Sequence, residues 1–452
     1  MQSKDTELFE KAPVLRAIVA LVVPTIISQL ILIVYNMADT FFIGQAGDPN
    51  QVAAANLCMP LFYFLTGFSN LFGIGGASLI SRSLGSGNKS RAEHAAAFCI
   101  WTSIAFGLIY GIVVYSQNVI ILYAFGANSG TYDFCRQYVF WTTGIGAAPT
   151  VLNAVLAHLV RAEGGAKQAG FGMIFGSVLN IILDPIFIFA LNMQIAGAAL
   201  ATFLSNTAAV AYYIVYILKQ KENTALKLNP IYYSVGDGIP EEVFLVGLPS
   251  FIMSMMSTVS NTTLNKLMAS YCNEAIAGVG IAKRIDVLLF GVGTGISQGV
   301  VPLIGYNYSS GNYARMKEAI KKTFIMSLII SGSFTFILYN FAQPIVALFI
   351  NDPLTVQYGQ TFQKIICMFG PCISITLIII SIFQSMGKKV QPLVLSLLRK
   401  GGIDVPFMFI MNAMLGVNGI VYATPIADVG AMTISILVFI PTWKKLKKEV
   451  GS

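Results

Sequence analysis

The sequence is poor in charged residues and in histidine, which excludes most soluble proteins. Only 11% of its 452 residues are charged and two are histidines, whereas 56% are hydrophobic. A soluble domain has about 25% charged residues, so a soluble chain of this composition could not cover its core with polar surface. The mean hydropathy of +0.72 indicates an integral membrane protein.

Signatures of catalysis and of tightly bound groups are also missing. The sequence has no P-loop, and its six cysteines do not have the spacing of a metal site. We therefore expect no enzyme, no cofactor and free thiols. The net charge of +8 does not predict nucleic-acid binding, because the basic residues follow the membrane topology.

Long apolar runs predict an all-α protein with twelve transmembrane helices, since each span needs about 20 apolar residues. The predicted spans are 13–44, 51–81, 92–124, 132–160, 167–190, 195–218, 239–270, 275–306, 314–340, 355–386, 389–412 and 417–441. Most of the 28 Lys and Arg residues lie in the termini and the even-numbered loops, and none lies in an odd-numbered loop. The positive-inside rule then places both termini in the cytoplasm. We expect the protein to lie in the plasma membrane.

The chain contains an internal repeat. With an offset of 224 residues, Ser86-Gly87-Asn88 aligns with Ser310-Gly311-Asn312, and with an offset of 222, Thr202 aligns with Thr424. We expect an N-terminal lobe at 1–218, a cytoplasmic linker at 219–238 and a C-terminal lobe at 239–452. Because each lobe has six spans, the two should be related by a pseudo-two-fold axis along the membrane normal.

Two acids in the first half lie within predicted spans without a basic neighbour. Asp39 follows Tyr35 by four residues, and Asp184 follows Asn180 by four, so each pair shares a helix face. A charge inside the membrane is costly, and two carboxylates without a base need a cation or a proton. The pattern predicts an oxygen-lined site for Na⁺ or H⁺; the alternative is that each acid is only hydrogen-bonded to a neighbouring helix.

The second half has a different pattern. Asp286 and Asp404 have basic residues nearby in their own helices, so structural ion pairs and functional roles both stay open for them. Asp428 has no such local partner and is the better functional candidate. Asn36 and the methionine-rich start of the seventh span, with Met253 and Met256, are further candidates for substrate binding, because methionine suits promiscuous surfaces.

Several segments together resemble the multidrug and toxic compound extrusion (MATE) transporters of prokaryotic type. They are YNMADTFFIG at 35–44, GGASLISRSLGSG at 75–87, LNIILDPIFIF at 179–189, GVVPLIGYNYSSG at 299–311 and the segment 425–428. The resemblance implies a cation site formed by Asp39, Asn180, Asp184 and Thr202, with Tyr35 and Asn153 nearby. It also implies export of cationic and amphiphilic drugs in exchange for Na⁺ or H⁺.

The sequence thus favours a monomeric secondary antiporter whose partners are small molecules and the lipid bilayer. One alternative is a lipid-linked oligosaccharide flippase of the same superfamily, for which we would expect a more basic cavity. The other is an ion channel, which would need symmetric rings of residues, whereas the repeat pairs Asp39 with Thr263.

Overall fold

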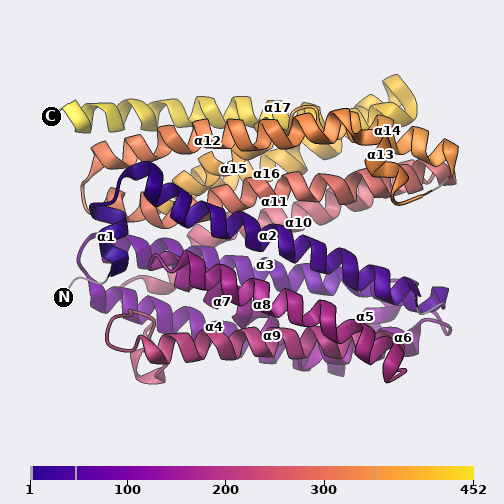
Figure 1. Ribbon diagram of the computed structural model, residues 1–452, viewed down its shortest axis with the longest axis horizontal. Helices are drawn as coiled ribbons and strands as arrows, with labels where there is room; N and C mark the ends of the chain where they lie inside the picture. Colours follow the sequence, from indigo (N-terminus) through magenta and orange to yellow (C-terminus); the bar gives the residue numbers. More distant parts are fainter. Residues whose placement is uncertain (1–3, 46–47, 351, 452) are drawn as a thin grey trace. The chain divides into compact units, whose positions relative to one another are not determined.

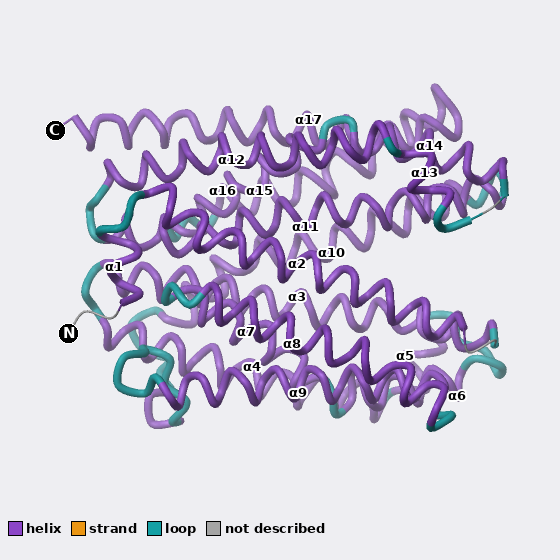
Figure 2. The backbone as a smooth tube through the Cα atoms, viewed as in Figure 1, coloured by secondary structure: helices purple, strands orange, loops and turns teal. Residues whose placement is uncertain are grey.

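The structure is a computed structural model that describes residues 4–45, 48–350 and 352–451. All regular elements in these ranges are helices, as Figure 2 shows. A helix satisfies every internal backbone hydrogen bond within one segment, which a segment surrounded by lipid requires. The long apolar runs of this sequence therefore form helices.

The first half of the chain contains α1 to α9 (Figure 1). Their bounds are α1 Lys4–Glu10, α2 Val14–Gln45, α3 Pro49–Gly85, α4 Lys89–Ser116, α5 Asn118–Ala124, α6 Tyr132–Val139, α7 Ala147–Ala162, α8 Ala166–Pro185 and α9 Gln194–Lys219. Two π-helical segments interrupt them, η1 Phe140–Gly144 and η2 Ile186–Ala190, and a 3₁₀ turn, η3 Pro230–Tyr232, lies in the segment that follows.

The second half contains α10 to α17 and one further π-helical segment. Their bounds are α10 Ile239–Met268, α11 Asn273–Ser309, α12 Tyr313–Asn340, α13 Ala342–Ala347, α14 Pro353–Cys367, α15 Gly370–Ser385, α16 Val390–Leu397, η4 Leu398–Asp404 and α17 Val405–Gly451.

The helices account for twelve spans. In the described ranges, nine helical stretches are long and apolar enough to cross a membrane, and two bent pairs raise the number to eleven. One of these stretches, Val390–Val450, has 61 residues and contains a non-helical residue at Gly416, with φ of 60°. At about 1.5 Å per residue this stretch is roughly three times longer than the hydrocarbon core, so it supplies two spans that meet at Gly416.

Two details of the predicted spans are wrong. The third span was expected to run over 92–124, but α4 ends at Ser116 and α5 begins at Asn118, so polar residues break the helix there. The span predicted at 132–160 ends too early, because Arg161 still lies in α7 with only 2% of its surface exposed. Its guanidinium contacts His158 Nδ1 at 3.2 Å.

The internal repeat is visible in the local structure. Asn88 and Asn312 cap α4 and α12 in the same way, each accepting a hydrogen bond from the backbone N–H three residues later. The glycines before them, Gly87 and Gly311, have φ of 76° and 75°, which favours glycine. The two bent spans also correspond, with bends of 43° between α6 and α7 and 44° between α14 and α15.

The contacts divide the chain into two compact units. The first unit comprises residues 1–9 and 31–251, and the second comprises residues 10–30 and 252–452. The long helices α2 and α10 therefore each contribute to both units. The lobe boundaries expected from the sequence stay a prediction.

The first unit is built on close helix contacts. The helices α3, α4 and α7 pack against one another, and α7 and α8 both pack against α9. Where α3 meets the start of α10, glycine allows the backbones to touch: a Cβ on Gly75 would collide with the carbonyl of Val243, and one on Gly247 with that of Leu71. This scaffold fixes α8 and α9 beside each other.

Candidate functional site

The first unit contains two buried aspartates from different helices. Asp39 lies in the last two turns of α2 and is 7% exposed, and Asp184 lies at the end of α8 and is fully buried. The two carboxylates are near enough to interact electrostatically. Among the described residues neither forms an ion pair, and the Oδ1 atom of each has no hydrogen-bond partner. Such orphaned carboxylate oxygens are costly in an apolar bundle, so they indicate a site that attracts positive charge.

Asn180 and Thr202 complete this cluster. Both are buried, on α8 and α9. When the Asn180 amide is turned so that its nitrogen faces Asp184, it donates to Asp184 Oδ2 at 3.0 Å and accepts from the Thr202 backbone N–H at 3.1 Å. The Thr202 hydroxyl donates to the carbonyl of Ala198 at 3.1 Å, which fixes its oxygen beside the amide. The amide thus holds the Asp184 carboxylate in place against α9.

The helix that carries Asp184 changes geometry at that residue. Pro185 has no N–H, so the carbonyl four residues earlier loses its usual donor, and the π-helical segment η2 follows immediately. Segments of π-helix are often found at functional sites. The same signal marks the second unit, where η4 contains Asp404.

Two tyrosines lie beside the carboxylates. Tyr35, one turn before Asp39, is near Thr202 and both acids, as expected from the sequence. Tyr138 on α6 is buried and interacts electrostatically with Asp39, Asp184 and Tyr35. Sequence reasoning missed Tyr138, because tyrosine carries no charge and neither Asp39 nor Asp184 lies on α6.

Asn153 joins the cluster through an intermediate residue. Its amide nitrogen donates to Asn206 Oδ1 at 2.8 Å, and Asn206 Nδ2 donates in turn to the carbonyl of Thr202 at 3.0 Å. Asn206 was also missed, although it follows Thr202 by four residues and therefore shares its helix face.

The charged residues of the second unit form ion pairs. Lys400 Nζ lies 2.9 Å from Asp404 Oδ2, and Lys283 Nζ lies 3.8 Å from Asp286 Oδ2. Asp286 and Asp404, whose roles the sequence left open, thus lie at the distances of structural ion pairs.

Asp428 has no basic partner close by in its own helix, but it pairs with a base of another segment. Arg399 Nε donates to Asp428 Oδ1 at 2.9 Å, and both side chains are 2% exposed. The guanidinium also stacks on the ring of Phe290, with its carbon 5.6 Å from the ring centroid. Arg399 lies on η4 and Asp428 on α17, so a search for partners within one helix could not find the pair.

The remaining substrate candidates are Asn36, Met253 and Met256. Asn36 is exposed, and its amide donates to the carbonyl of Leu32 in its own helix. Met253 and Met256 are half-buried on α10, and the sulfur of Met256 packs close to Gly401. Asn36 is thus bonded within its own helix, and Met256 lies beside the segment that carries Asp404.

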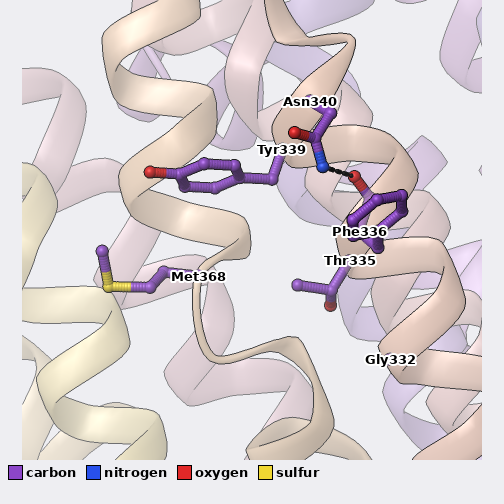
Figure 3. A pocket seen from close by; sticks show the side chains of 6 residues that line it. All are labelled: Gly332, Thr335, Phe336, Tyr339, Asn340 and Met368. Carbon is purple, nitrogen blue, oxygen red and sulfur yellow. Dashed lines mark hydrogen bonds between the residues drawn. The ribbon is translucent and has the colours of Figure 1, made fainter.

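A cavity of about 320 Å³ lies elsewhere in the second unit, between α12 and the bend that joins α14 to α15 (Figure 3). Its lining residues are Gly332, Thr335, Phe336, Tyr339, Asn340 and Met368. None of the predicted site residues lines it, so it is not the predicted site.

The side-chain atoms of the first-unit cluster that could hold a cation are all oxygens. It offers two carboxylates, an amide and a hydroxyl, which suit a hard cation or a proton. No group of three or more His, Cys, Asp or Glu side chains in the described part of the chain has the geometry of a metal site. A cation bound here would therefore be held partly by neutral oxygens.

Comparisons with known proteins give one family. A family model described as MatE matches residues 24–186 and 249–410. The chain is 31% identical to the multidrug export protein MepA of Staphylococcus saprophyticus over 440 residues, which is 97% of this chain and 96% of the relative. It is 32% identical to MepA of Staphylococcus aureus over 427 residues, 94% of each chain.

Solved structures agree with this assignment. An outward-facing multidrug resistance MATE family transporter of the MOP superfamily matches with a TM-score of 0.93 and 25% identity, covering 99% of this chain and all of the other. A MATE structure in a bent conformation matches with a TM-score of 0.90. The expected fold, an all-α membrane protein with twelve spans in two lobes, is confirmed. The protein is a multi-pass membrane transporter, and the chain belongs to the MatE family.

Proposed function

We propose that this protein exports cationic and amphiphilic drugs from the cell in exchange for Na⁺ or H⁺. The observation that carries the proposal is the pair of buried carboxylates, Asp39 and Asp184, on separate helices with no basic partner among the described residues. The MepA relatives are named multidrug export proteins, which supports the drug part of the proposal.

The coupling ion would bind to the ligand set of the first unit. A cation bound by Asp39 and Asp184 joins α2 to α8, and Asn180 and Thr202 extend its ligands to α9. The ion therefore stabilises the arrangement of helices in which these oxygens converge. If the drug prefers the other access state, the difference in affinity is enough to couple the two flows.

The ligands of the site keep both coupling ions open. A cluster with a formal charge of −2 attracts Na⁺, and its amide and hydroxyl oxygens supply neutral ligands. Buried carboxylates that interact with each other also retain a proton more readily than exposed ones do. No cofactor is required in either case.

The alternatives receive less support. The relatives are named for drug export, which favours an antiporter over the oligosaccharide flippase and the ion channel. Asp39 pairs in the repeat with Thr263, whose hydroxyl donates to the carbonyl of Val259 in its own helix. The two units therefore differ chemically at equivalent positions, unlike the symmetric ring of a channel.

The test is neutralisation of the two acids. Asp39→Asn and Asp184→Asn should each abolish gradient-driven efflux of a cationic dye from proteoliposomes, because the remaining charge is too small to hold the cation. The double variant should be little worse than either single variant, since the acids act as a unit. Thr202→Ala should have a milder effect, because it removes one neutral oxygen.

Asp48→Asn provides a matched control. Asp48 caps α3 by accepting from the Asn50 backbone N–H at 2.9 Å, and asparagine caps equally well. This variant should transport normally. Proteoliposomes with opposed Na⁺ and pH gradients distinguish the two coupling ions, and full efflux by both aspartate variants would refute the proposal.

A further inference from the structure

The second unit contains a cluster of six charged side chains for which the proposed function gives no role. The members come from α11, η4 and α17, and they are Lys283, Asp286, Arg399, Lys400, Asp404 and Asp428. Three are acids and three are bases, so the formal charge of the cluster is zero. The cluster of the first unit has two acids and no base.

The internal repeat relates the two clusters residue by residue. With an offset of 220, Asp184 aligns with Asp404 and Asn180 aligns with Lys400, so an i,i+4 pair occupies the same place in both halves. The flanking residues agree, because Phe187 and Phe189 align with phenylalanines at 407 and 409. Lysine therefore replaces the asparagine that holds the aspartate in the first unit.

The neighbouring helix repeats as well. With an offset of 222, Thr202 aligns with Thr424, and Asn206 aligns with Asp428. The second unit thus retains an aspartate and a threonine at the positions that supply oxygen ligands in the first unit, and it adds a second acid.

Ammonium groups lie against both of these retained ligands. Lys400 Nζ lies 2.9 Å from Asp404 Oδ2, and Lys283 Nζ lies 3.5 Å from the hydroxyl of Thr424. Ser260 of α10 donates to the same Asp404 oxygen at 2.7 Å. The oxygens that would bind an ion are thus in contact with cations that belong to the chain.

Two carboxylates of this cluster still have an oxygen without a hydrogen bond. Asp404 is fully buried and Asp428 is 1% exposed, yet Asp404 Oδ1 and Asp428 Oδ2 have no hydrogen-bond partner among the described residues. A buried carboxylate needs a compensating positive charge. Here that charge comes from lysine and arginine side chains of the same unit.

We propose that the second unit contains a copy of the cation site in which the Lys400 ammonium is a tethered cation, occupying the place of an exchangeable ion. The ammonium cannot dissociate, so the second unit does not exchange a cation, and the transporter has one coupling site. Removal of the ammonium should convert the second cluster into a site for a free monovalent cation. The count of one coupling site rests on the proposed function of the first unit.

The experiment removes the first site and then the tether. In purified full-length protein carrying Asp39→Asn and Asp184→Asn, the melting temperature should not respond to Na⁺, exchanged for choline at constant ionic strength, or to a change from pH 8 to pH 6. Adding Lys400→Asn, which restores the residue found in the first unit, should lower the melting temperature by about 5 °C. Na⁺ or the lower pH should then restore about 3 °C of this loss.

A third arm tests the ammonium itself. Lys400→Ala in the same background should be stabilised by n-propylammonium, which replaces the missing side chain, and not by choline. The matched control is Lys322→Asn, since Lys322 forms an exposed i,i+4 pair with Glu318 and no buried acid depends on it. This control should respond to none of the cations.

The outcomes separate the two proposals. A lack of response to Na⁺, protons and n-propylammonium in the Lys400 variants, or their failure to fold in all three conditions, overturns the tethered cation. The unmodified protein is the test of the first unit. If its melting temperature responds neither to Na⁺ nor to pH, the proposed function of the first unit is refuted. The Lys400 variants are measured without that site, so their result is independent of it.

Discussion

The ion pair between Arg399 and Asp428 should be among the most destabilising charged contacts to break in the second unit. Both side chains are 2% exposed, and the pair is 2.9 Å long. Asp428→Asn leaves a buried guanidinium whose Nη1 atom already has no hydrogen-bond partner among the described residues. Removing one partner of a buried pair costs about 3–5 kcal/mol.

The reasoning also predicts the effect of removing both charges. Arg399→Met keeps an apolar stem beside Phe290, and together with Asp428→Asn it removes both charges of the pair, so the formal charge of the cluster stays at zero. The double variant should therefore recover much of the stability lost by either single variant, with a coupling of about 2–3 kcal/mol. The exposed pair Lys322–Glu318 is the control, and Glu318→Gln should cost at most about 0.5 kcal/mol.

A thiol-reactive fluorophore can follow the unfolding of these variants. Five of the six free cysteines are buried, so they react only when the helices separate. Drug efflux per folded molecule is measured in parallel, and the double variant should retain it. If the stability losses of the two single variants add up in the double variant, Arg399 and Asp428 do not act as a structural pair. An Asp428→Asn variant that is stable but inactive would show that Asp428 acts on the substrate.

Three further predictions follow from particular contacts. A cysteine that replaces Ser90 should react with a membrane-impermeant reagent only from the cytoplasmic side. A cysteine that replaces Asp352 should react only from outside. Reversed labelling would contradict the predicted topology. Gly75→Ala should lower stability by about 1–3 kcal/mol in a thermal melt, because its Cβ meets the Val243 carbonyl, and an unchanged melting temperature would show that α3 and α10 can separate there. Hydrogen bonds from Thr355 lower the pKa of Asp352. The ionised Asp352 carboxylate therefore stabilises α14 at pH values above the usual carboxyl pKa, and this stabilisation is lost as the pH falls through the lowered pKa. Asp352→Ala should therefore flatten the dependence of the melting temperature on acid pH.

Much of the fold could be predicted from the sequence because the lipid environment leaves few alternatives. Apolar runs of the required length must be helical, and the turn at Gly416 falls in a loop predicted at 413–416. The break at Gln117 was missed. Only three consecutive polar residues, 116–118, mark it, and long apolar stretches lie on both sides. The repeat was visible because turn residues such as Gly87 and Gly311 have the same backbone requirement in both halves.

The candidate site could be predicted only where its residues share a helix or belong to the rare acids. Asp39 and Asp184 were found because charges are scarce within the spans, and Asn180 because it precedes Asp184 by four residues. Tyr138 and Asn206 carry no charge, and tyrosine and asparagine occur elsewhere in the chain without such contacts. Their roles depend on which helices pack together. The spacing of residues within a single helix does not reveal this packing.

The charges of the second unit show the same limit more sharply. The sequence identified Lys400 and Asp404 as neighbours because they are four residues apart on one helical face. It left Asp428 without a partner because Arg399 lies 29 residues away, beyond the turn at Gly416. That turn reverses the chain, and only the resulting contact between η4 and α17 brings the two side chains together. An acid without a basic neighbour in its own helix therefore indicates an ion site only when no base of a neighbouring helix pairs with it, and Asp39 and Asp184 form no ion pair among the described residues.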